Sequence, residues 1–278
     1  MPPLSIHLGI AGLLAGLLAG LPAPARAETY ATCTGFVDSV PTTISTQGNW
    51  CLRKDLSTAI TSGRAIHIDA NNVTLDCNGF KVGGLAAGPG SEAKGIFAID
   101  QYNVTIRNCT VRGFQTGIVL AGGGHLVEDN RIEANLYTGV QASGDGNIVQ
   151  RNRILDTGGA TGGTTSNGFY GQADLVDNTI AGIFTDAPDG NAIGMYVNGD
   201  NQEISGNRIR GLVGDPIGII VAGAGVTIRG NNLSAVALVP LGNGITGSGA
   251  ATACINNTVA GFSTAYSSCE ASAGNLSP

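Results

Sequence analysis

The apolar residues of this chain recur in a fixed unit, which is repeated eight times between Ala65 and Val259. Each unit opens with a glycine, or once with an alanine, that an apolar residue follows directly. Successive openings lie 22 to 30 residues apart. The openings are Ala65-Ile66, Gly95-Ile96, Gly117-Ile118, Gly139-Val140, Gly168-Phe169, Gly194-Met195, Gly218-Ile219 and Gly244-Ile245.

Each unit closes with an asparagine, a variable residue and an apolar residue. Six closings follow their opening by 13 residues, one by 14 (with Cys109 in place of asparagine) and one by 10 (Asn178). The closings are Asn78-Gly-Phe80, Cys109-Thr-Val111, Asn130-Arg-Ile132, Asn152-Arg-Ile154, Asn178-Thr-Ile180, Asn207-Arg-Ile209, Asn231-Asn-Leu233 and Asn257-Thr-Val259. Three positions before each closing stands another apolar residue: Leu75, Ile106, Val127, Val149, Leu175, Ile204, Ile228 and Cys254.

Apolar residues within a unit alternate with polar ones, as Val104 and Ile106 do. This period of two is typical of β-strands, and no helical pattern follows residue 28. A unit of this length cannot bury its apolar face alone, so the units must stack. The glycine indicates a corner where a side chain would crowd the next coil. The asparagine indicates a turn with left-handed backbone and amides stacked along the axis. The pattern predicts an all-β, single-stranded parallel solenoid of about eight coils over residues 63–262.

The composition agrees with this fold. Glycine accounts for 44 of 278 residues, and charged residues for only 12%, while 42% are hydrophobic. The chain is therefore rich in turns but apolar enough to form a core. We expect one solenoid domain, flanked by a capping segment at residues 28–62 and a cap or tail at residues 263–278.

The N-terminus is typical of a secretory signal peptide, which we expect over residues 1–27. Its apolar run, Leu8 to Leu21, is too short to span a bilayer and is followed by the small-x-small triplet Ala25-Arg26-Ala27. No lysine or arginine precedes the run, and a retained hydrophobic anchor is the alternative. Cleavage removes Arg26, leaving 13 basic and 20 acidic residues and a net charge of −7. This charge argues against a nucleic-acid partner, and we expect no membrane insertion after cleavage.

Six cysteines indicate an oxidising compartment and 15 possible pairings. In the repeat register Cys77 and Cys109 lie one position apart at the same corner of adjacent coils, within disulfide reach. A Cys33–Cys51 bridge would close the N-terminal segment, and a Cys254–Cys269 bridge would hold the C-terminal tail. We expect structural disulfides that tie the ends of the solenoid, since no Cys-x-x-Cys occurs.

The segments NNVTLDCNGFKVGG and NVTIRNCTVRGFQTGIVL, with the units that follow, resemble the right-handed parallel β-helix repeat proteins over about residues 60–260. This superfamily includes pectate-lyase-like and NosD-like proteins, so the resemblance implies a right-handed β-helix and work on carbohydrate. The hydrolase motifs Asn-Thr-Asp and Gly-His-Gly are absent, the nearest strings being Asn178-Thr-Ile180 and Gly124-His125-Leu126. The epimerase motif Asp-Pro-His-Glu is also absent.

Residues between two inward positions should face solvent. One outward column, two positions after each opening, contains Phe97, Val119, Gln141, Tyr170, Tyr196, Ile220 and Thr246. The two tyrosines should stack on adjacent coils and could bind a sugar ring, although stacking beneath neighbouring loops is the alternative.

A basic column contains Lys81, Arg112, Arg131, Arg153, Arg208 and Arg210. Its arginines could bind an acidic polysaccharide, or could simply form a solvated face.

Two insertions, at residues 155–168 and 181–191, flank the shortened coil. Insertions in solenoids form loops that often bind ligands. We therefore expect Asp174, Asp186 and Asp189 to be the best candidates for an acid/base pair or a Ca²⁺ site, although ordinary turns also explain them. His67 and His125 have no second histidine or cysteine pair nearby in the sequence, so no zinc or copper centre is predicted.

The sequence thus favours a secreted or periplasmic β-helix protein of bacterial type that binds poly- or oligosaccharide or serves as a surface scaffold. The alternative is a polysaccharide lyase or glycoside hydrolase acting on a uronate polymer. Its catalytic candidates are Asp174, Asp186 and Asp189 with Arg153 or Arg208, and Tyr170, Tyr196 and Arg131 would help to bind the substrate. No cofactor is expected, except Ca²⁺ if the protein is a lyase.

Overall fold

The computed structural model describes residues 30–235, 242–247 and 250–278. It divides the chain into two compact units, Met1–Tyr30 and Ala31–Pro278. The predicted signal peptide lies outside the described residues. The second unit contains the whole of the strand pattern described below.

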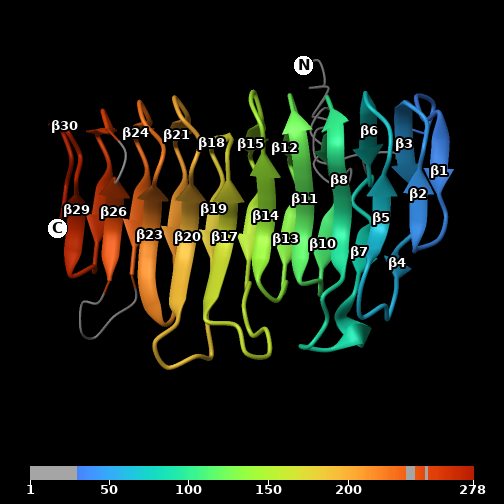
Figure 1. The fold of residues 1–278 in the computed structure, drawn as a ribbon, viewed down its shortest axis with the longest axis horizontal. Helices are drawn as coiled ribbons and strands as arrows, with labels where there is room; N and C mark the ends of the chain where they lie inside the picture. The colour runs from blue at the N-terminus through green and yellow to red at the C-terminus, as the bar shows by residue number, and fades with distance from the viewer. Residues whose placement is uncertain (1–29, 236–241, 248–249) are drawn as a thin grey trace, which may run out of the picture. The chain divides into compact units, whose positions relative to one another are not determined.

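The second unit is a stack of coils whose strands form three parallel sheets (Figure 1). Sheet A consists of β1 (Gly35–Val37), β3 (Gly48–Leu52), β6 (Val73–Asp76), β9 (Thr105–Arg107), β12 (Leu126–Glu128), β15 (Ile148–Gln150), β18 (Asp174–Val176), β21 (Glu203–Ser205), β24 (Thr227–Arg229), β27 (Ala253–Ile255) and β30 (Ala271–Ala273). Sheet B consists of β2 (Thr42–Ile44), β5 (Arg64–Ile68), β8 (Lys94–Tyr102), β11 (Thr116–Gly123), β14 (Thr138–Ser143), β17 (Thr165–Gly171), β20 (Asn191–Val197), β23 (Asp215–Val221), β26 (Asn243–Gly247) and β29 (Thr264–Ser267). Sheet C consists of β4 (Leu56–Ser57), β7 (Lys81–Gly83), β10 (Thr110–Arg112), β13 (Arg131–Glu133), β16 (Arg153–Leu155), β19 (Thr179–Ala181), β22 (Arg208–Arg210), β25 (Asn232–Ser234) and β28 (Thr258–Ala260).

Each coil from β5 onward runs through sheet B, then sheet A, then sheet C, and nine strands of sheet C are described. A short 3₁₀ helix, η1 (Leu85–Ala87), lies between β7 and β8. The predicted parallel solenoid is therefore confirmed, with about one coil more than expected.

The predicted inward columns are also confirmed. The apolar residues after the opening glycines pair in register along sheet B, as Ile96 does with Ile118. The residues three before the closing asparagines pair along sheet A, as Ile106 does with Val127. Both columns are buried in one continuous apolar core. The core is thus formed by straight rows of side chains, one row from each sheet.

The opening glycines lie where neighbouring coils approach most closely. A Cβ atom added to Gly168 would lie 2.6 Å from the carbonyl oxygen of Gly194 and 2.7 Å from a methyl carbon of Ile180. We expect Gly168→Ala to lower the free energy of unfolding by about 1–3 kcal/mol, because the added carbon overpacks a backbone contact. Gly90→Ala is the matched control, since no atom lies within 4 Å of its added Cβ. Chemical denaturation of both variants measures the difference, and equal stability would contradict the close approach.

The closing asparagines form a buried hydrogen-bond ladder between sheets A and C. In each step the side-chain oxygen of one asparagine accepts two hydrogen bonds from the preceding asparagine, one from its backbone N–H and one from its side-chain amide. The oxygen of Asn207, for example, accepts from the backbone N–H of Asn178 at 2.9 Å and from its side-chain amide at 3.0 Å. The ladder runs through Asn130, Asn152, Asn178, Asn207, Asn231, Asn257 and Asn275. The predicted stacking of amides is therefore confirmed.

The predicted left-handed backbone is confirmed at Asn78 (φ 51°), but in the ladder coils it lies one residue earlier than predicted. It occurs at the residue before each ladder asparagine, as in Asp129 (φ 55°), Asp177 (φ 54°) and Gly206 (φ 66°). Asparagine is needed at the next position for a different reason. Its side chain satisfies a backbone N–H and a backbone carbonyl of the preceding coil and donates to the side-chain oxygen of the next asparagine, as Asn178 does at a buried corner.

A second buried corner, between sheets B and A, contains His125. The side chain is 1% exposed, and its Nδ1 accepts the N–H of Val104 at 3.2 Å. Burial lowers the pKa of His125 below its ordinary value of 6.5, and the carbonyl of Ala121 offsets this in part. The folded protein therefore holds this imidazole neutral under conditions in which the unfolded chain protonates it.

Acid should consequently destabilise the protein through His125. The penalty is absent above pH 6.5 and grows as the pH falls below that value toward the lower folded pKa, because only the unfolded state gains the proton. In His125→Asn, the amide oxygen can accept the Val104 N–H, and we expect a flatter dependence of the melting temperature on pH between about 5 and 6.5. Parallel curves for variant and wild type would refute this role.

All six cysteines form the expected disulfides. Cys33 is bonded to Cys51, Cys77 to Cys109 and Cys254 to Cys269. The bridges tie both ends of the solenoid, as predicted.

The first closing triplet is out of register. Val82, rather than Phe80, pairs with Val111 in sheet C. Four residues (77–80) separate β6 from β7, whereas two (108–109) separate β9 from β10. The longer turn takes Asn78 out of the ladder, and its side chain instead donates to the carbonyl of Leu52 at 3.2 Å.

The coils also extend beyond the predicted range of residues 63–262. Strands β1 to β4, in the expected N-terminal cap, pair in parallel with the coils that follow. Strands β29 and β30, in the expected C-terminal tail, likewise pair with β26 and β27. These end coils lack the Gly-apolar opening, which is why the repeat pattern did not reveal them.

Candidate functional site

The outer face of sheet B carries the predicted pair of stacked tyrosines. Tyr170 of β17 and Tyr196 of β20 are direct register partners. Their ring centroids are 5.1 Å apart and their planes differ by 18°. Tyr170 is 38% exposed, and Tyr196 is half-buried. The two rings therefore form a partly exposed aromatic stack that spans neighbouring coils.

The rest of this outward column follows the predicted order. Along sheet B, Phe97 pairs with Val119, Val119 with Gln141, and Gln141 with Tyr170. Beyond the tyrosines, Tyr196 pairs with Ile220. The column thus passes from the buried apolar side chains of Phe97 and Val119 to the more exposed Tyr170.

The predicted basic column is divided into two by the structure, both on the outer face of sheet C. Arg131 and Arg153 are register partners, whereas Arg112 pairs with Glu133 in the neighbouring column. Glu133 forms ion pairs with both Arg112 and Arg131. In the described part of the chain, Arg153 and Arg208 form no ion pair and are exposed.

The three carboxylate candidates do not meet. Asp174 begins β18 in sheet A, after the turn from sheet B. Asp186 and Asp189 are exposed in the loop between β19 and β20, at the turn from sheet C to sheet B. The loops before β17 and β20 lie along the lower edge of Figure 1, away from β18's turn. The expected cluster is therefore wrong, because a coil of three sheets places residues 174 and 186 at different corners.

Asp174 belongs instead to a polar hollow of about 520 Å³ at the turns from sheet B to sheet A. Asp145 and Asp200 line it as well, and one oxygen of each carboxylate is already bound by the protein. Asp145 accepts from Gln172 at 2.7 Å, Asp174 from the N–H of Glu203 at 2.8 Å, and Asp200 from the N–H of Ala224 at 2.7 Å. These bonds give the acidic residues a role in holding the turns.

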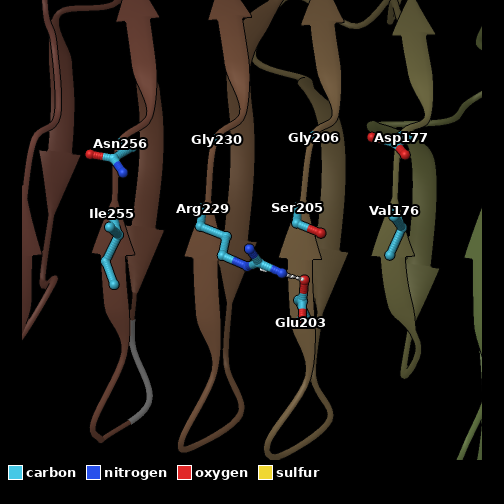
Figure 2. Close-up of a pocket in the computed structure, with 9 residues that line it drawn as sticks. All are labelled: Val176, Asp177, Glu203, Ser205, Gly206, Arg229, Gly230, Ile255 and Asn256. Carbon is cyan, nitrogen blue, oxygen red and sulfur yellow. Dashed lines mark hydrogen bonds and ion pairs between the residues drawn. The ribbon is translucent and has the colours of Figure 1, made fainter.

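A larger hollow, of about 640 Å³, lies on the outer face of sheet A beside the asparagine turns. The same left-handed turn position of four successive coils is occupied by Asp177, Gly206, Gly230 and Asn256. The hollow opens at the two glycines, which lie between the two larger residues (Figure 2). An added Cβ at Gly230 would meet no atom within 4 Å. The sequence interpretation missed this hollow, although the two glycines in a position otherwise occupied by side chains are a readable signal.

Two of the three charged side chains that line this hollow, Arg229 and Glu203, pair with each other, and Asp177 is the third. Arg229 donates to Glu203 at 2.5 Å, as the dashed line in Figure 2 shows. The hydroxyl of Ser205 and the guanidinium of Arg229 lower the pKa of Glu203, while burial opposes them. The carboxylate is therefore ionised and already paired, which suits a structural role across coils better than acid catalysis.

Among residues 30–235, 242–247 and 250–278, no group of three or more His, Cys, Asp or Glu side chains is placed to hold a metal ion. Nor does that part of the chain contain a helix with the length and hydropathy needed to cross a bilayer.

Comparisons with known proteins identify the fold. A family model described as the right handed beta helix region matches residues 94–263. No curated protein matches the chain. Among solved structures it is similar to the Dettilon tailspike protein, with 16% identity over 81% of this chain and 53% of the tailspike, at a TM-score of 0.49. It is also similar to the A-module of a mannuronan C-5 epimerase from Azotobacter vinelandii, with 14% identity over 89% of this chain and 91% of the module, at a TM-score of 0.44. The chain spans about half of the tailspike's length.

Proposed function

The chain belongs to the right-handed β-helix family, and from this premise we propose that it is an exported carbohydrate-binding protein whose ligand lies on the outer face of sheet B. Export is supported by three disulfides that use all six cysteines, a pattern of oxidising compartments. The periplasm or the cell exterior are the expected locations.

The stacked pair of Tyr170 and Tyr196 is the observation that carries the proposal. Apolar faces of sugar rings pack against aromatic side chains, and the two stacked, nearly parallel rings form one continuous aromatic contact surface across two coils. A parallel sheet holds them rigidly, because both residues belong to strands that are hydrogen-bonded on each side. Little conformational freedom would be lost on binding.

The other two faces support binding less well. On sheet C, the acidic side chain of Glu133 forms ion pairs with two of the arginines and offsets one of their two charges. On sheet A, the hollow of Figure 2 is dominated by the internal pair of Arg229 and Glu203. The separation of Asp174 from Asp186 and Asp189 likewise favours a binding protein over a lyase or hydrolase, since acid/base catalysis needs two groups flanking one bond.

A glycan array probed with the protein lacking residues 1–27 tests the proposal. We expect retention of one class of poly- or oligosaccharide, and loss of that retention in Tyr196→Ala. Retention of no glycan at all would overturn it and leave a structural or adhesive scaffold.

Catalysis is tested on the same preparation. Uronate polymers are incubated with the protein, with and without Ca²⁺, and the ultraviolet absorbance of unsaturated products and the release of reducing ends are followed. We expect neither to rise. Turnover that is lost in Asp174→Asn or Asp186→Asn would establish the enzyme alternative instead.

A further inference from the structure

A small hollow lies on the same outer face, at the N-terminal end of sheet B. Its volume is about 410 Å³. The lining residues come from the strands β2 and β5 and the turns before them: Pro41, Thr42, Thr43, Gly63, Arg64 and His67. Thr43 and His67 are register partners, and His67 in turn pairs with Phe97. The hollow therefore lies at the N-terminal end of the same outward column that contains Tyr170 and Tyr196.

Arg64 is held flat at the edge of this hollow. The central carbon of its guanidinium lies 3.9 Å from the ring centroid of Phe97. The ring of His67 meets that of Phe97 edge-on, with centroids 5.7 Å apart. Phe97 is only 8% exposed, so these neighbours cover it. Stacking fixes the plane of the guanidinium and leaves its N–H edge free for an oxyanion.

The positive charge of Arg64 has no partner within the described residues, where it forms no ion pair. Its register partner across the sheet is a second cation, Lys94. Like charges directly opposite one another destabilise a sheet. Lys94 donates to the carbonyl of Glu92 at 2.8 Å and to the side chain of Gln115, and burial lowers its pKa while the Glu92 carboxylate opposes this.

Arg53 shows what a stacked arginine looks like when its charge is satisfied internally. Its guanidinium lies 4.2 Å from the ring centroid of Phe36, which is the same arrangement. However, Asp38 neutralises it through two hydrogen bonds of 2.8 Å. The contrast indicates that Arg64 is left available for a group from outside the protein.

We propose that Arg64, with His67 and Thr43, forms a subsite for the acidic group of a sugar, a carboxylate or a sulfate ester. This inference rests on the proposed carbohydrate binding and names the ligand class. His67 is separated from Tyr196 by five strand spacings of about 4.8 Å, or about 24 Å along the axis. The ligand is therefore an extended acidic oligosaccharide that crosses the coils, with its rings on the tyrosines and an anionic group at Arg64.

The test compares three probes by calorimetry. The first is an oligogalacturonate long enough to span the two positions, the second is the same oligomer with its carboxylates reduced to alcohols, and the third is a sulfated carrageenan oligosaccharide. Each is titrated into the wild type and into Arg64→Gln, Arg53→Gln and Tyr196→Ala. Circular dichroism melting confirms that the exposed substitutions leave the fold intact.

We expect Arg64→Gln to weaken binding of an acidic probe by about tenfold or more and to leave the reduced oligomer within about twofold of wild type. Arg53→Gln should bind like wild type, and Tyr196→Ala should weaken acidic and reduced probes alike. Whether oligogalacturonate or carrageenan is preferred distinguishes carboxylate from sulfate.

Two results would overturn the subsite. One is an Arg64→Gln variant that binds acidic probes as tightly as wild type while Tyr196→Ala does not, which leaves the carbohydrate-binding face standing. The other is a wild type that binds the reduced oligomer but neither acidic probe. If no probe and no glycan of the array binds, both the subsite and the proposed function fail.

Discussion

Replacing Asn178 with leucine is expected to lower the free energy of unfolding by about 3–5 kcal/mol. The side chain is 1% exposed and makes four hydrogen bonds. Its oxygen accepts the backbone N–H and amide of Asn152, and its amide donates to Val149 and to Asn207. Leucine has the right size but removes these buried partners from the N–H of Asn152 and the carbonyl of Val149 on the preceding coil, and water cannot replace them.

Asn232→Ala is the matched control for this experiment. Asn232 is exposed on the outer face of sheet C, one residue after the ladder residue Asn231, and its loss should cost less than about 0.5 kcal/mol. Guanidinium chloride unfolding, followed by circular dichroism, gives both midpoints. If Asn178→Leu were as stable as Asn232→Ala, the amide ladder would not be what holds this corner together.

Removing both stacked tyrosines should have the largest effect on function. We expect Tyr170→Ala/Tyr196→Ala to weaken binding of the retained oligosaccharide by about 30-fold or more, and each single variant by about tenfold. The reason is that the aromatic stack exists only while both rings are present, since each supports the orientation of the other at a centroid distance of 5.1 Å. Calorimetric titration with the oligosaccharide identified on the array measures the three affinities.

Tyr102→Ala serves as the control for this series, because Tyr102 is 59% exposed near the end of β8 and lies outside the outward column. It should bind within about twofold of wild type. If the double variant bound the oligosaccharide with an affinity within about threefold of the wild type, the tyrosines would stack for structural reasons only.

The sequence predicted the fold well because the fixed spacing of the repeat defines which residues of successive coils are register partners. Once Gly168 and Asn178 are recognised as corners, the period of two assigns each residue between them to the core or to solvent. The tyrosine pair follows directly, since Tyr170 and Tyr196 occupy the same position in consecutive units. The disulfide between Cys77 and Cys109 follows in the same way.

Other features depend on information that a register does not contain. A count of residues cannot say which corner an insertion joins, so Asp174 was grouped with Asp186 although they lie at different turns. Nor does the pattern show how a long side chain bends across coils. The stacking of Arg64 on Phe97 is a diagonal contact between two outward columns, and it emerges only in three dimensions.

The most direct measurement is a crystal structure of residues 28–278 with the retained oligosaccharide bound. The account predicts sugar rings packed against Tyr170 and Tyr196, with the chain running along the outer face of sheet B. Sugar bound in the hollow between Asp177 and Asn256 on sheet A, or on the arginines of sheet C, would contradict it.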